Sequence, residues 1–308
     1  MIHTANLYLT LDPTDIDFIQ NKYNVALNLL SDTLSTTSIR VHFFRHYGIQ
    51  YMNFNVDFIK LLDTSCIAED DFEKVCLKIS NYLEGIFKND CKFEKLVLTR
   101  IDYRLDAIVP KEHRDILLNL YKKTIDKHGH KEKNDSFNTS LYFKSKSMQL
   151  CIYDKETECK SKGRNIKYYE KNVLRLEVRL LNRHLNYMKN SNGLAKCLQN
   201  YFSNSFFVDY VSKNINQVLF TGDYYKIDKA RSIINSSILK EKDKNFLIEF
   251  LICVSRNNIT YAKKAYSNYY FRKALNNLSN LGINPILIPK NYKNSPSFIQ
   301  NPFKLNHF

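Results

Sequence analysis

The chain has 308 residues, a mass of 36.4 kDa and a formal net charge of +15 at pH 7. A hydrophobic fraction of 44% with only 7 Gly and 6 Pro excludes a disordered or fibrous protein, and the length allows one large domain plus a smaller one. No apolar run approaches the roughly 20 residues of a membrane helix, and no signal-peptide pattern precedes the first expected strand. The seven cysteines form no CxxC pair, so we expect reduced thiols and a cytoplasmic protein.

The positive charge is concentrated in the second half of the chain. Residues 1–140 hold 18 Lys and Arg against 20 Asp and Glu, whereas residues 141–308 hold 28 against 11. A basic half of this kind is typical of proteins that bind a polyanion such as DNA. A basic protein without such a partner remains an alternative. Membrane binding is disfavoured because the basic residues are not gathered beside an apolar anchor.

In chain order, alternation of apolar residues first predicts three strands with short connections, over Asn6–Thr10, Arg40–Phe44 and Tyr51–Phe58. An amphipathic helix is expected over Ala68–Phe87, where apolar residues recur every third or fourth position. A strand over Leu98–Asp106 follows, and a second helix begins at Pro110. These elements predict a sheet covered by helices.

The middle of the chain predicts further strands, and the end predicts helices. A charged loop is expected over 126–138, then a hairpin of Leu141–Phe143 with Met148–Tyr153, a charged connection over 156–167, and a strand over Leu174–Leu180. From Asn200 the apolar spacing is helical, with one stripe over Phe246–Val254 and another from Ile259 to a stop at Gly282. The predicted fold is α+β, with an antiparallel sheet domain over 1–199 and a basic helical subdomain over 200–308.

Three of these strands place polar side chains on one face, because side chains alternate along a strand. In Leu98–Asp106 this face carries Arg100, Asp102, Arg104 and Asp106; in Leu174–Leu180 it carries Arg175, Glu177 and Arg179; in Met148–Lys155 it carries Gln149, Cys151, Tyr153 and Lys155. If the three strands pair in one sheet, we expect its exposed face to bring these groups together, with Asp102 and Glu177 flanking Tyr153.

Such a face has the groups that cleave a phosphodiester. A tyrosine supplies the nucleophile, here Tyr153, and Mg²⁺ or Mn²⁺ bound by Asp102 and Glu177 would neutralise the developing charge. The flanking arginines could grip phosphates, and Lys155 could lower the pKa of the phenol or hold the scissile phosphate. The alternative is a solvent-facing sheet whose charges form cross-strand pairs and whose tyrosine packs.

The order of the motifs resembles that of a known family. Arg100-Ile101-Asp102, then Tyr153-Asp154-Lys155-Glu156, then Leu174-Arg175-Leu176-Glu177-Val178-Arg179 are similar to elements of the filamentous-phage gene II replication proteins. More distantly, R-I-D, Y-D-K and R-x-E occur in the same order in the initiators of small rolling-circle plasmids of Gram-positive bacteria. The resemblance runs over about residues 92–190 and is weaker over Asn53–Leu62 and the C-terminal helices.

The resemblance implies a rolling-circle replication initiator that works inside a bacterial host cell. Such a protein nicks one strand at an origin, stays attached through a 5′-phosphotyrosine, leaves a free 3′-hydroxyl and later rejoins the displaced strand. By position, the nucleophile falls on Tyr153 and the two motif carboxylates fall on Asp102 and Glu177. The implied partners are origin DNA, double- and single-stranded, and the host helicase, polymerase and single-strand-binding protein, without a membrane.

Several alternatives stay open at this point. The His-hydrophobic-His metal motif of many rolling-circle nucleases is absent, and His128-Gly129-His130 is interpreted as a solvated loop. Rival nucleophiles are Tyr142, Tyr168, Tyr169, Tyr224 and Tyr225. A non-catalytic DNA-binding repressor or partition factor, or a mobilisation relaxase, would fit much of the same pattern.

The C-terminal helices are the second place where DNA contacts are expected. Basic residues there could contact phosphates, while asparagines such as Asn257, Asn258, Asn276 and Asn277 could reach base edges in a helix-turn-helix-like unit. The candidate phosphate contacts are Arg256, Lys263, Lys264, Arg272 and Lys273. Ordinary helix packing with a basic solvated face accounts for the same residues.

Overall fold

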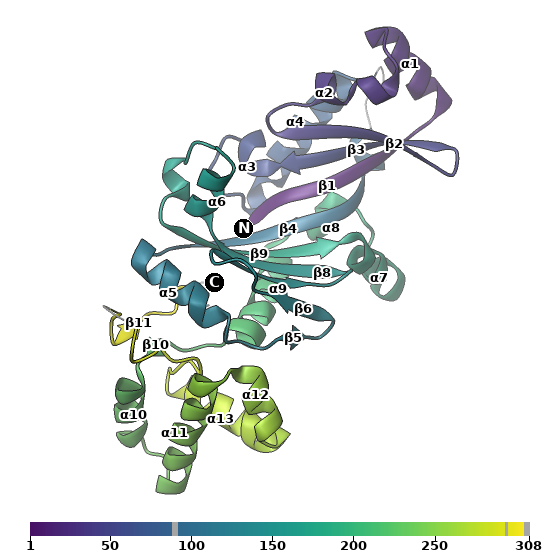
Figure 1. Cartoon of the computed structure of the whole chain (residues 1–308). Helices are drawn as coiled ribbons and strands as arrows, with labels where there is room; N and C mark the ends of the chain where they lie inside the picture. The colour runs from purple at the N-terminus through teal and green to yellow at the C-terminus, as the bar shows by residue number, and fades with distance from the viewer. Residues whose placement is uncertain (88–91, 293–294, 305–308) are drawn as a thin grey trace. The chain divides into compact units, whose positions relative to one another are not determined.

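The computed structural model describes residues 1–87, 92–292 and 295–304, and the chain forms an antiparallel sheet with flanking helices and a helical C-terminal region (Figure 1). The sheet has nine strands in the order β2-β3-β1-β4-β9-β8-β7-β6-β5, and β10 and β11 form a separate pair. The predicted α+β class is therefore confirmed. Strands β4, β9 and β8 are neighbours in this order, as the motif pattern predicts.

The chain divides into two compact units that interleave in sequence. Unit 1 contains Met1–Arg104, Lys146–Gln149 and Glu177–Asp209, and unit 2 contains Leu105–Ser145, Leu150–Leu176 and Tyr210–Phe308. The predicted functional division between residues 199 and 200 stays a prediction.

Unit 1 is built on β1, β2 and β3. Strand β1 pairs with β3 on one side and with β4 on the other, so its neighbours in the sheet are not its neighbours in the sequence. The buried face of β1, β2 and β3 carries Leu7, Leu9, Val41 and Phe54, and the α4 residue Tyr82 packs edge-on against the Phe54 ring. The elements wholly within this unit are β1 (Ile2–Leu11), α1 (Pro13–Tyr23), α2 (Ser31–Leu34), β2 (Ile39–His46), β3 (Ile49–Asp57), α3 (Phe58–Leu61), α4 (Phe72–Glu84), α7 (Asn182–Asn192) and α8 (Leu198–Tyr201).

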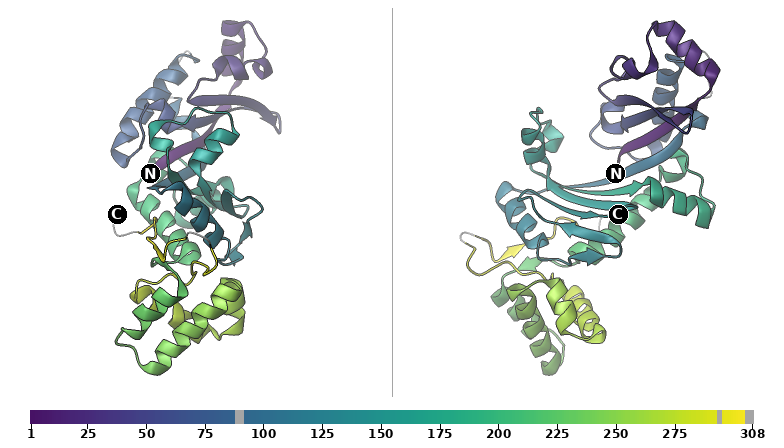
Figure 2. Two further views of the ribbon diagram at one scale, coloured as in Figure 1. Left: turned by 60° about the vertical axis from the view of Figure 1, so that its left-hand side comes forward. Right: turned by 45° about the vertical axis from the view of Figure 1, so that its right-hand side comes forward.

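Unit 2 carries the other sheet edge and the helices of the C-terminal region, of which α10 to α13 gather in one group (Figure 2). Its elements are α5 (Lys111–Tyr121), β5 (Lys127–His128), β6 (Lys131–Asn134), β7 (Ser140–Lys144), α6 (Lys155–Ser161), β10 (Tyr224–Tyr225), α10 (Ile227–Asn235), α11 (Glu241–Arg256), α12 (Ile259–Ala265), α13 (Asn268–Asn280) and β11 (Phe298–Ile299). Four longer elements have residues in both units: β4 (Val97–Ile108), β8 (Met148–Asp154), β9 (Val173–Leu181) and α9 (Asn204–Asn214).

Most predicted elements are confirmed, and three expectations are corrected. The charged segment 126–138 is not a plain loop, because Gly129 at φ +59° turns the chain between β5 and β6. The connection 156–167 begins with helix α6, which the side chain of Asp154 caps by accepting from the N–H of Thr157 at 3.0 Å. The stripe from Ile259 to Gly282 is two helices, since Ser267 begins α13 as its N-cap.

No helix in the described ranges is long and apolar enough to cross a bilayer. All cysteines within those ranges are free thiols, as expected, and Cys91 lies outside them.

Candidate functional site

In unit 1 the structure brings Asp102 and Glu177 into one group, which we call the carboxylate–arginine cluster: Thr4, Arg100, Asp102, Glu177 and Arg179. The register of β1 with β4 sets Thr4 opposite Asp102 and Asn6 opposite Arg100. The register shifts between Ile2 and Thr4, and such irregularities often occur beside functional sites because they redirect side chains.

Both carboxylates of the cluster are held by charge-assisted hydrogen bonds. Nε of Arg100 donates to Oδ1 of Asp102 at 2.7 Å, and Oγ1 of Thr4 donates to Oδ2 at 2.7 Å. Nη2 of Arg179 donates to Oε2 of Glu177 at 2.7 Å, while its Nε lies 3.8 Å from Oδ2 of Asp102. Arg179 therefore bridges the two carboxylates, which were predicted to act together.

The prediction that this polar face is exposed is wrong. Asp102 and Glu177 are each 2% exposed, and Arg104 and Arg175, which were predicted to share this face, are 6% and 1% exposed. Alternation along a strand fixes which side chains share a face, but it does not show what covers that face. The arginines remain the accessible part of the cluster, since the side chains of Arg100 and Arg179 are 28% and 25% exposed.

His3 of β1 lies against this cluster, and Arg104 follows Asp102 by two residues on β4. Nδ1 of His3 is 3.3 Å from Oε1 of Glu177, outside hydrogen-bonding geometry. Arg104 is 6% exposed, and its Nη2 donates to the backbone oxygen of Ser65 at 2.6 Å. His3 and Thr4 are functional candidates that motif analysis missed, because β1 carries no charged pattern that would set them apart.

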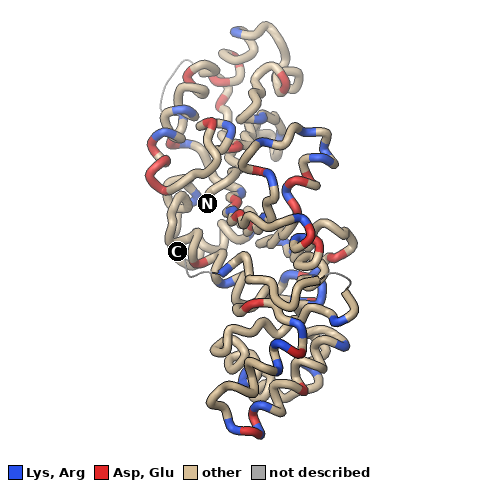
Figure 3. The backbone as a smooth tube through the Cα atoms, turned by 90° about the vertical axis from the view of Figure 1, so that its left-hand side faces the viewer, with Lys and Arg blue, Asp and Glu red and all other residues tan. Residues whose placement is uncertain are grey.

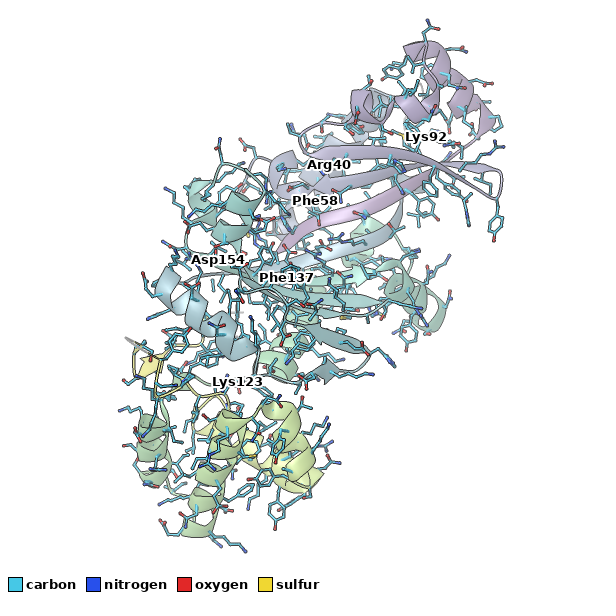
Figure 4. All side chains as sticks on the ribbon, viewed as in Figure 1. Arg40, Phe58, Lys92, Lys123, Phe137 and Asp154 are labelled. Carbon is cyan, nitrogen blue, oxygen red and sulfur yellow. The ribbon has the colours of Figure 1, made fainter. Side chains whose placement is uncertain are left out.

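In unit 2 the predicted nucleophile lies at the end of a buried strand. Tyr153 is the penultimate residue of β8 and is 8% exposed, and Cys151 on the same face is 0% exposed. The expectation that Lys155 continues this strand face is wrong, because β8 ends at Asp154 and Lys155 begins α6 (Figure 4 labels Asp154 at this junction). The change from strand to helix therefore falls directly after the tyrosine.

The ammonium group of Lys155 is held by acidic residues of the α6 region. Its Nζ donates to Oε2 of Glu158 at 2.8 Å and lies 3.4 Å from Oε1 of Glu170, and Lys155 is 4% exposed. Burial would raise the pKa of Glu158, but hydrogen bonds from Lys155 and Lys162 outweigh it and lower the pKa to about 2. The carboxylate of Glu158 is thus ionised throughout the physiological range.

A buried arginine that the motifs did not indicate fixes the same junction. Arg114 of α5 is 1% exposed, and its Nε donates to Oδ2 of Asp154 at 2.8 Å. Its other nitrogens donate to the oxygens of Val109, Asn172 and Glu156 at 2.7, 3.0 and 3.1 Å. The sequence contained a signal for this contact. Arg114 precedes the buried Leu117 by three residues and therefore lies on the apolar side of the helix, where an arginine requires buried partners.

The remaining motif arginine, Arg175, is paired within unit 2. Its Nε and Nη2 donate to the two oxygens of Asp106 at 2.7 and 2.8 Å, and it is 1% exposed. Such a parallel two-bond pair is among the strongest ion-pair geometries. Arg175 is thus engaged by protein, and its predicted contact with DNA stays a prediction.

Among the basic C-terminal residues predicted to contact phosphates, some line a hollow in the surface and another forms an ion pair. Lys263 and Arg272 line a hollow of about 640 Å³ in unit 2 together with His128 and Asn276. Lys264 is exposed on α12. Nζ of Lys273, by contrast, is 2.6 Å from Oδ1 of Asp243, and this hydrogen bond raises the pKa of Lys273. Figure 3 shows the positions of the Lys and Arg residues along these helices.

Local structure also uses two of the asparagines that were predicted to reach bases. Oδ1 of Asn258 accepts from the N–H of Tyr261 at 2.8 Å and so caps α12, and Nδ2 of Asn257 donates to the oxygen of Cys253 at 3.1 Å. Their side chains therefore help to end one helix and begin the next. Asn276, which lines the hollow, is the better placed of the predicted base contacts.

The His128-Gly129-His130 segment lies at a concentration of positive charge. Burial lowers the pKa of His128, and the charges of Lys131, Lys213 and Lys263 lower it further. In the described ranges no group of three or more His, Cys, Asp or Glu residues has the arrangement of a metal site. The lysines that lower the pKa of His128 make this segment part of a cationic region of unit 2.

Comparison with protein-family models identifies a family that the chain matches. Residues 31–206 match the model of a family described as the N-terminal part of the gene II replication-associated protein, and this range covers more than half of the chain. It extends beyond the predicted 92–190 in both directions and includes β2 and β3. No curated protein matches the chain with significance.

Proposed function

The chain belongs to the family of gene II replication-associated proteins, whose members are rolling-circle replication initiators, and we propose that it starts replication by nicking one strand of an origin with Tyr153. The observation that carries the proposal is the family match combined with the two motif carboxylates, Asp102 and Glu177, held in one cluster by Arg179. The alternative, a non-catalytic DNA-binding repressor or partition factor, would use the same basic residues but would form no covalent bond to DNA.

The proposed reaction is a transesterification. The phenol oxygen of Tyr153 attacks the scissile phosphorus as its proton leaves, a P–O bond to the tyrosine forms, and the bond from phosphorus to the 3′ oxygen breaks. The leaving oxygen takes up a proton and becomes the free 3′-hydroxyl that primes synthesis. Because the phosphotyrosine keeps the energy of the broken bond, the reverse attack can rejoin the displaced strand.

We assign Mg²⁺ or Mn²⁺ binding to Asp102 and Glu177. Both ions prefer oxygen ligands, and Mg²⁺ commonly uses only one or two carboxylates together with water and phosphate oxygens, so this donor set fits. When bound, the ion would polarise the phosphoryl oxygens of the scissile phosphate. To bind the ion, Asp102 and Glu177 would give up some of their hydrogen bonds to Arg100 and Arg179.

The two accessible arginines take the complementary role. Arg100 and Arg179 are partly exposed and extend from the cluster, so they can contact phosphate oxygens of the bound strand. Arg104 and Arg175, with exposures of 6% and 1%, need a local rearrangement before they can reach DNA, and we assign them to the support of the strands. In this proposal the role of Lys155 is structural. Its ion pairs with Glu158 and Glu170 hold the start of α6, which follows Tyr153 in the chain by two residues.

The C-terminal helices would bind double-stranded origin DNA. Lys263, Lys264 and Arg272 are exposed and form no ion pair among the described residues, whereas Lys273 is paired with Asp243. Phosphate contacts of this type release counterions and give salt-dependent affinity. Charge-removing variants at Lys263 and Arg272 should therefore weaken binding more than Lys273→Gln.

The proposal is tested with supercoiled plasmid that carries the origin of the element, incubated with the protein and Mg²⁺ or Mn²⁺. Wild-type protein should give a nicked circle with covalently attached protein, and Tyr153→Phe should give none. The matched control is Tyr168→Phe, since Tyr168 is a rival nucleophile that is 79% exposed. Cleavage that persists in Tyr153→Phe and disappears in Tyr168→Phe would overturn the assignment.

The metal assignment is tested separately. Asp102→Asn and Glu177→Gln should abolish nicking while origin binding in a gel-shift assay stays within about two-fold of wild type. Isothermal titration with Mn²⁺ should show weaker ion binding to both variants in the absence of DNA. Equal losses of nicking and of DNA binding would instead make the two carboxylates structural.

A further inference from the structure

Unit 1 has an uncovered sheet face that the reaction described above does not use. Residues of β1, β2 and β3 alternate between a buried apolar face and a second face whose side chains are exposed or half-buried. We call this second face the aromatic platform. Its members are Asn6, Tyr8, Thr10, Arg40, His42, Phe44, Tyr51, Asn53 and Asn55.

The strand registers arrange the aromatic platform in three rows. The first row reads Arg40–Asn55–Asn6 and is continued on β4 by Arg100 of the carboxylate–arginine cluster, the second reads His42–Asn53–Tyr8 and the third Phe44–Tyr51–Thr10. No member of these rows is a carboxylate. Arg40, labelled in Figure 4 on β2, is exposed and forms no ion pair within the described part of the chain, so its charge is available.

Aromatic rings occupy the end of the aromatic platform that lies nearest the turn between β2 and β3. Phe44 and Tyr51 stack with ring centroids 4.9 Å apart, and Tyr8 meets Tyr51 edge-on at 5.5 Å. Beyond them the hairpin turn carries Tyr47, which is 92% exposed. An uncovered sheet face is normally lined by charged and small polar residues, because ring surface in contact with water is unfavourable.

The aromatic platform adjoins the carboxylate–arginine cluster. Asn6 and Arg100 of the first row are each two residues from the cross-strand pair Thr4 and Asp102 on the same strands. Two residues along a strand span roughly 7 Å, so the two surfaces are continuous. A polymer lying across the rows would therefore extend to Asp102.

From these observations we propose that the aromatic platform binds the single-stranded DNA that adjoins the nick, through base stacking on Phe44, Tyr51 and Tyr8. Bases stack on aromatic rings regardless of sequence, while Asn side chains bond base edges and Arg40 contacts phosphate. Duplex DNA hides its base faces and would not use the rings. The inference rests on the proposed function for its biological role, but the binding itself needs neither nicking nor metal.

The chain contains no tryptophan, which makes a direct optical test possible. Tyr51→Trp introduces one indole that can stack in the same place, and the Tyr153→Phe background with a chelator excludes nicking. Titration with (dT)20 should quench the tryptophan emission saturably, whereas a 20-base-pair duplex should quench it less than about one tenth as strongly. Tyr187→Trp, at a position on α7 that is 61% exposed, is the matched control and should not respond.

The second test of the inference measures the affinity of platform variants for single-stranded DNA. Fluorescence anisotropy with labelled (dT)20 should show Kd raised about five-fold or more by Tyr51→Ala and by Phe44→Ala, and unchanged by Tyr187→Ala. Arg40→Gln should reduce the slope of log K against log salt by about 0.7, whereas Arg183→Gln on α7 should leave it unchanged. This slope reports phosphate contact and would not move if Arg40 only supported the fold.

Three results would overturn the inference: no binding of (dT)20, binding without quenching at residue 51, or equal quenching by the duplex. If Tyr51→Trp does not fold, Phe44→Trp gives the same readout. Origin nicking by wild-type protein, together with no quenching of Tyr51→Trp by (dT)20, would leave the proposed function in place while refuting the platform. Conversely, quenching by (dT)20 together with an absence of any covalent product would retain the platform and refute the nicking.

Discussion

Replacing Arg114 with Met is expected to lower the free energy of unfolding by about 3–5 kcal/mol, because it leaves the carboxylate of Asp154 buried without its guanidinium partner. The structure supports this magnitude: Arg114 is 1% exposed, Asp154 is 2% exposed, and four hydrogen bonds from Arg114 are lost with the side chain. In a domain of 150–250 residues such a loss corresponds to a Tm lower by about 6–20 °C.

The assay is thermal unfolding followed by calorimetry and far-ultraviolet circular dichroism. The matched control is Arg164→Met, since Arg164 also donates to a carboxylate, at 2.6 Å to Glu158, but its side chain is 41% exposed. It should cost less than about 1 kcal/mol. The double variant Arg114→Met/Asp154→Asn should recover at least about 1 kcal/mol of the loss. Equal costs for Arg114→Met and Arg164→Met would refute the reasoning.

Three further predictions concern backbone conformation and pH. Gly222→Ala should destabilise by about 2–5 kcal/mol in calorimetry, because φ is +93° and a Cβ would lie 2.5 Å from a backbone carbon; Gly193→Ala, at φ +69° with open space, should cost only about 1 kcal/mol, and equal costs would contradict this. Burial and then the charge of Lys213 lower the pKa of Lys131 to about 8, so its proton destabilises the fold at lower pH. Below pH 8, Lys131→Met should therefore have a free energy of unfolding about 1–3 kcal/mol higher than wild type, as measured by denaturant unfolding. This difference should shrink as the pH rises from 8 to 10.5. The pKa of Glu158, lowered to about 2, contributes stability that is present above about pH 4.5 and is lost as pH falls towards 2; acid titrations of Glu158→Gln should lack this component, and an unchanged acid limb would exclude it.

The strands and their polar pattern could be predicted because a period of two is a strong local signal. Asn6–Thr10, Arg40–Phe44 and Tyr51–Phe58 lie within or close to β1, β2 and β3. The order β4-β9-β8 also agrees with the pairing assumed for the motifs. What alternation could not supply was burial, since the layer that covers a strand is set by distant parts of the chain.

Short elements were missed for a different reason. Helix α6 has seven residues, too few for an apolar period, and its signals are the cap Asp154 and the acidic first turn with Glu156 and Glu158. Strands β5 and β6 consist of Lys, His, Glu and Asn and have no apolar alternation at all. Their hairpin forms because β6 pairs with β7. Contacts of this kind, like that of Arg114 with Asp154, join residues too far apart in sequence for a local pattern to reveal.

The most direct test of the central claim is to map the covalent bond between protein and DNA. Wild-type protein is incubated with supercoiled origin DNA and Mg²⁺, the product is digested with nuclease and protease, and the peptides are analysed by mass spectrometry. We predict a nucleotide phosphate attached to the peptide that contains Tyr153, at that residue. Attachment at another tyrosine, or nicked DNA without any attached peptide, would contradict the account.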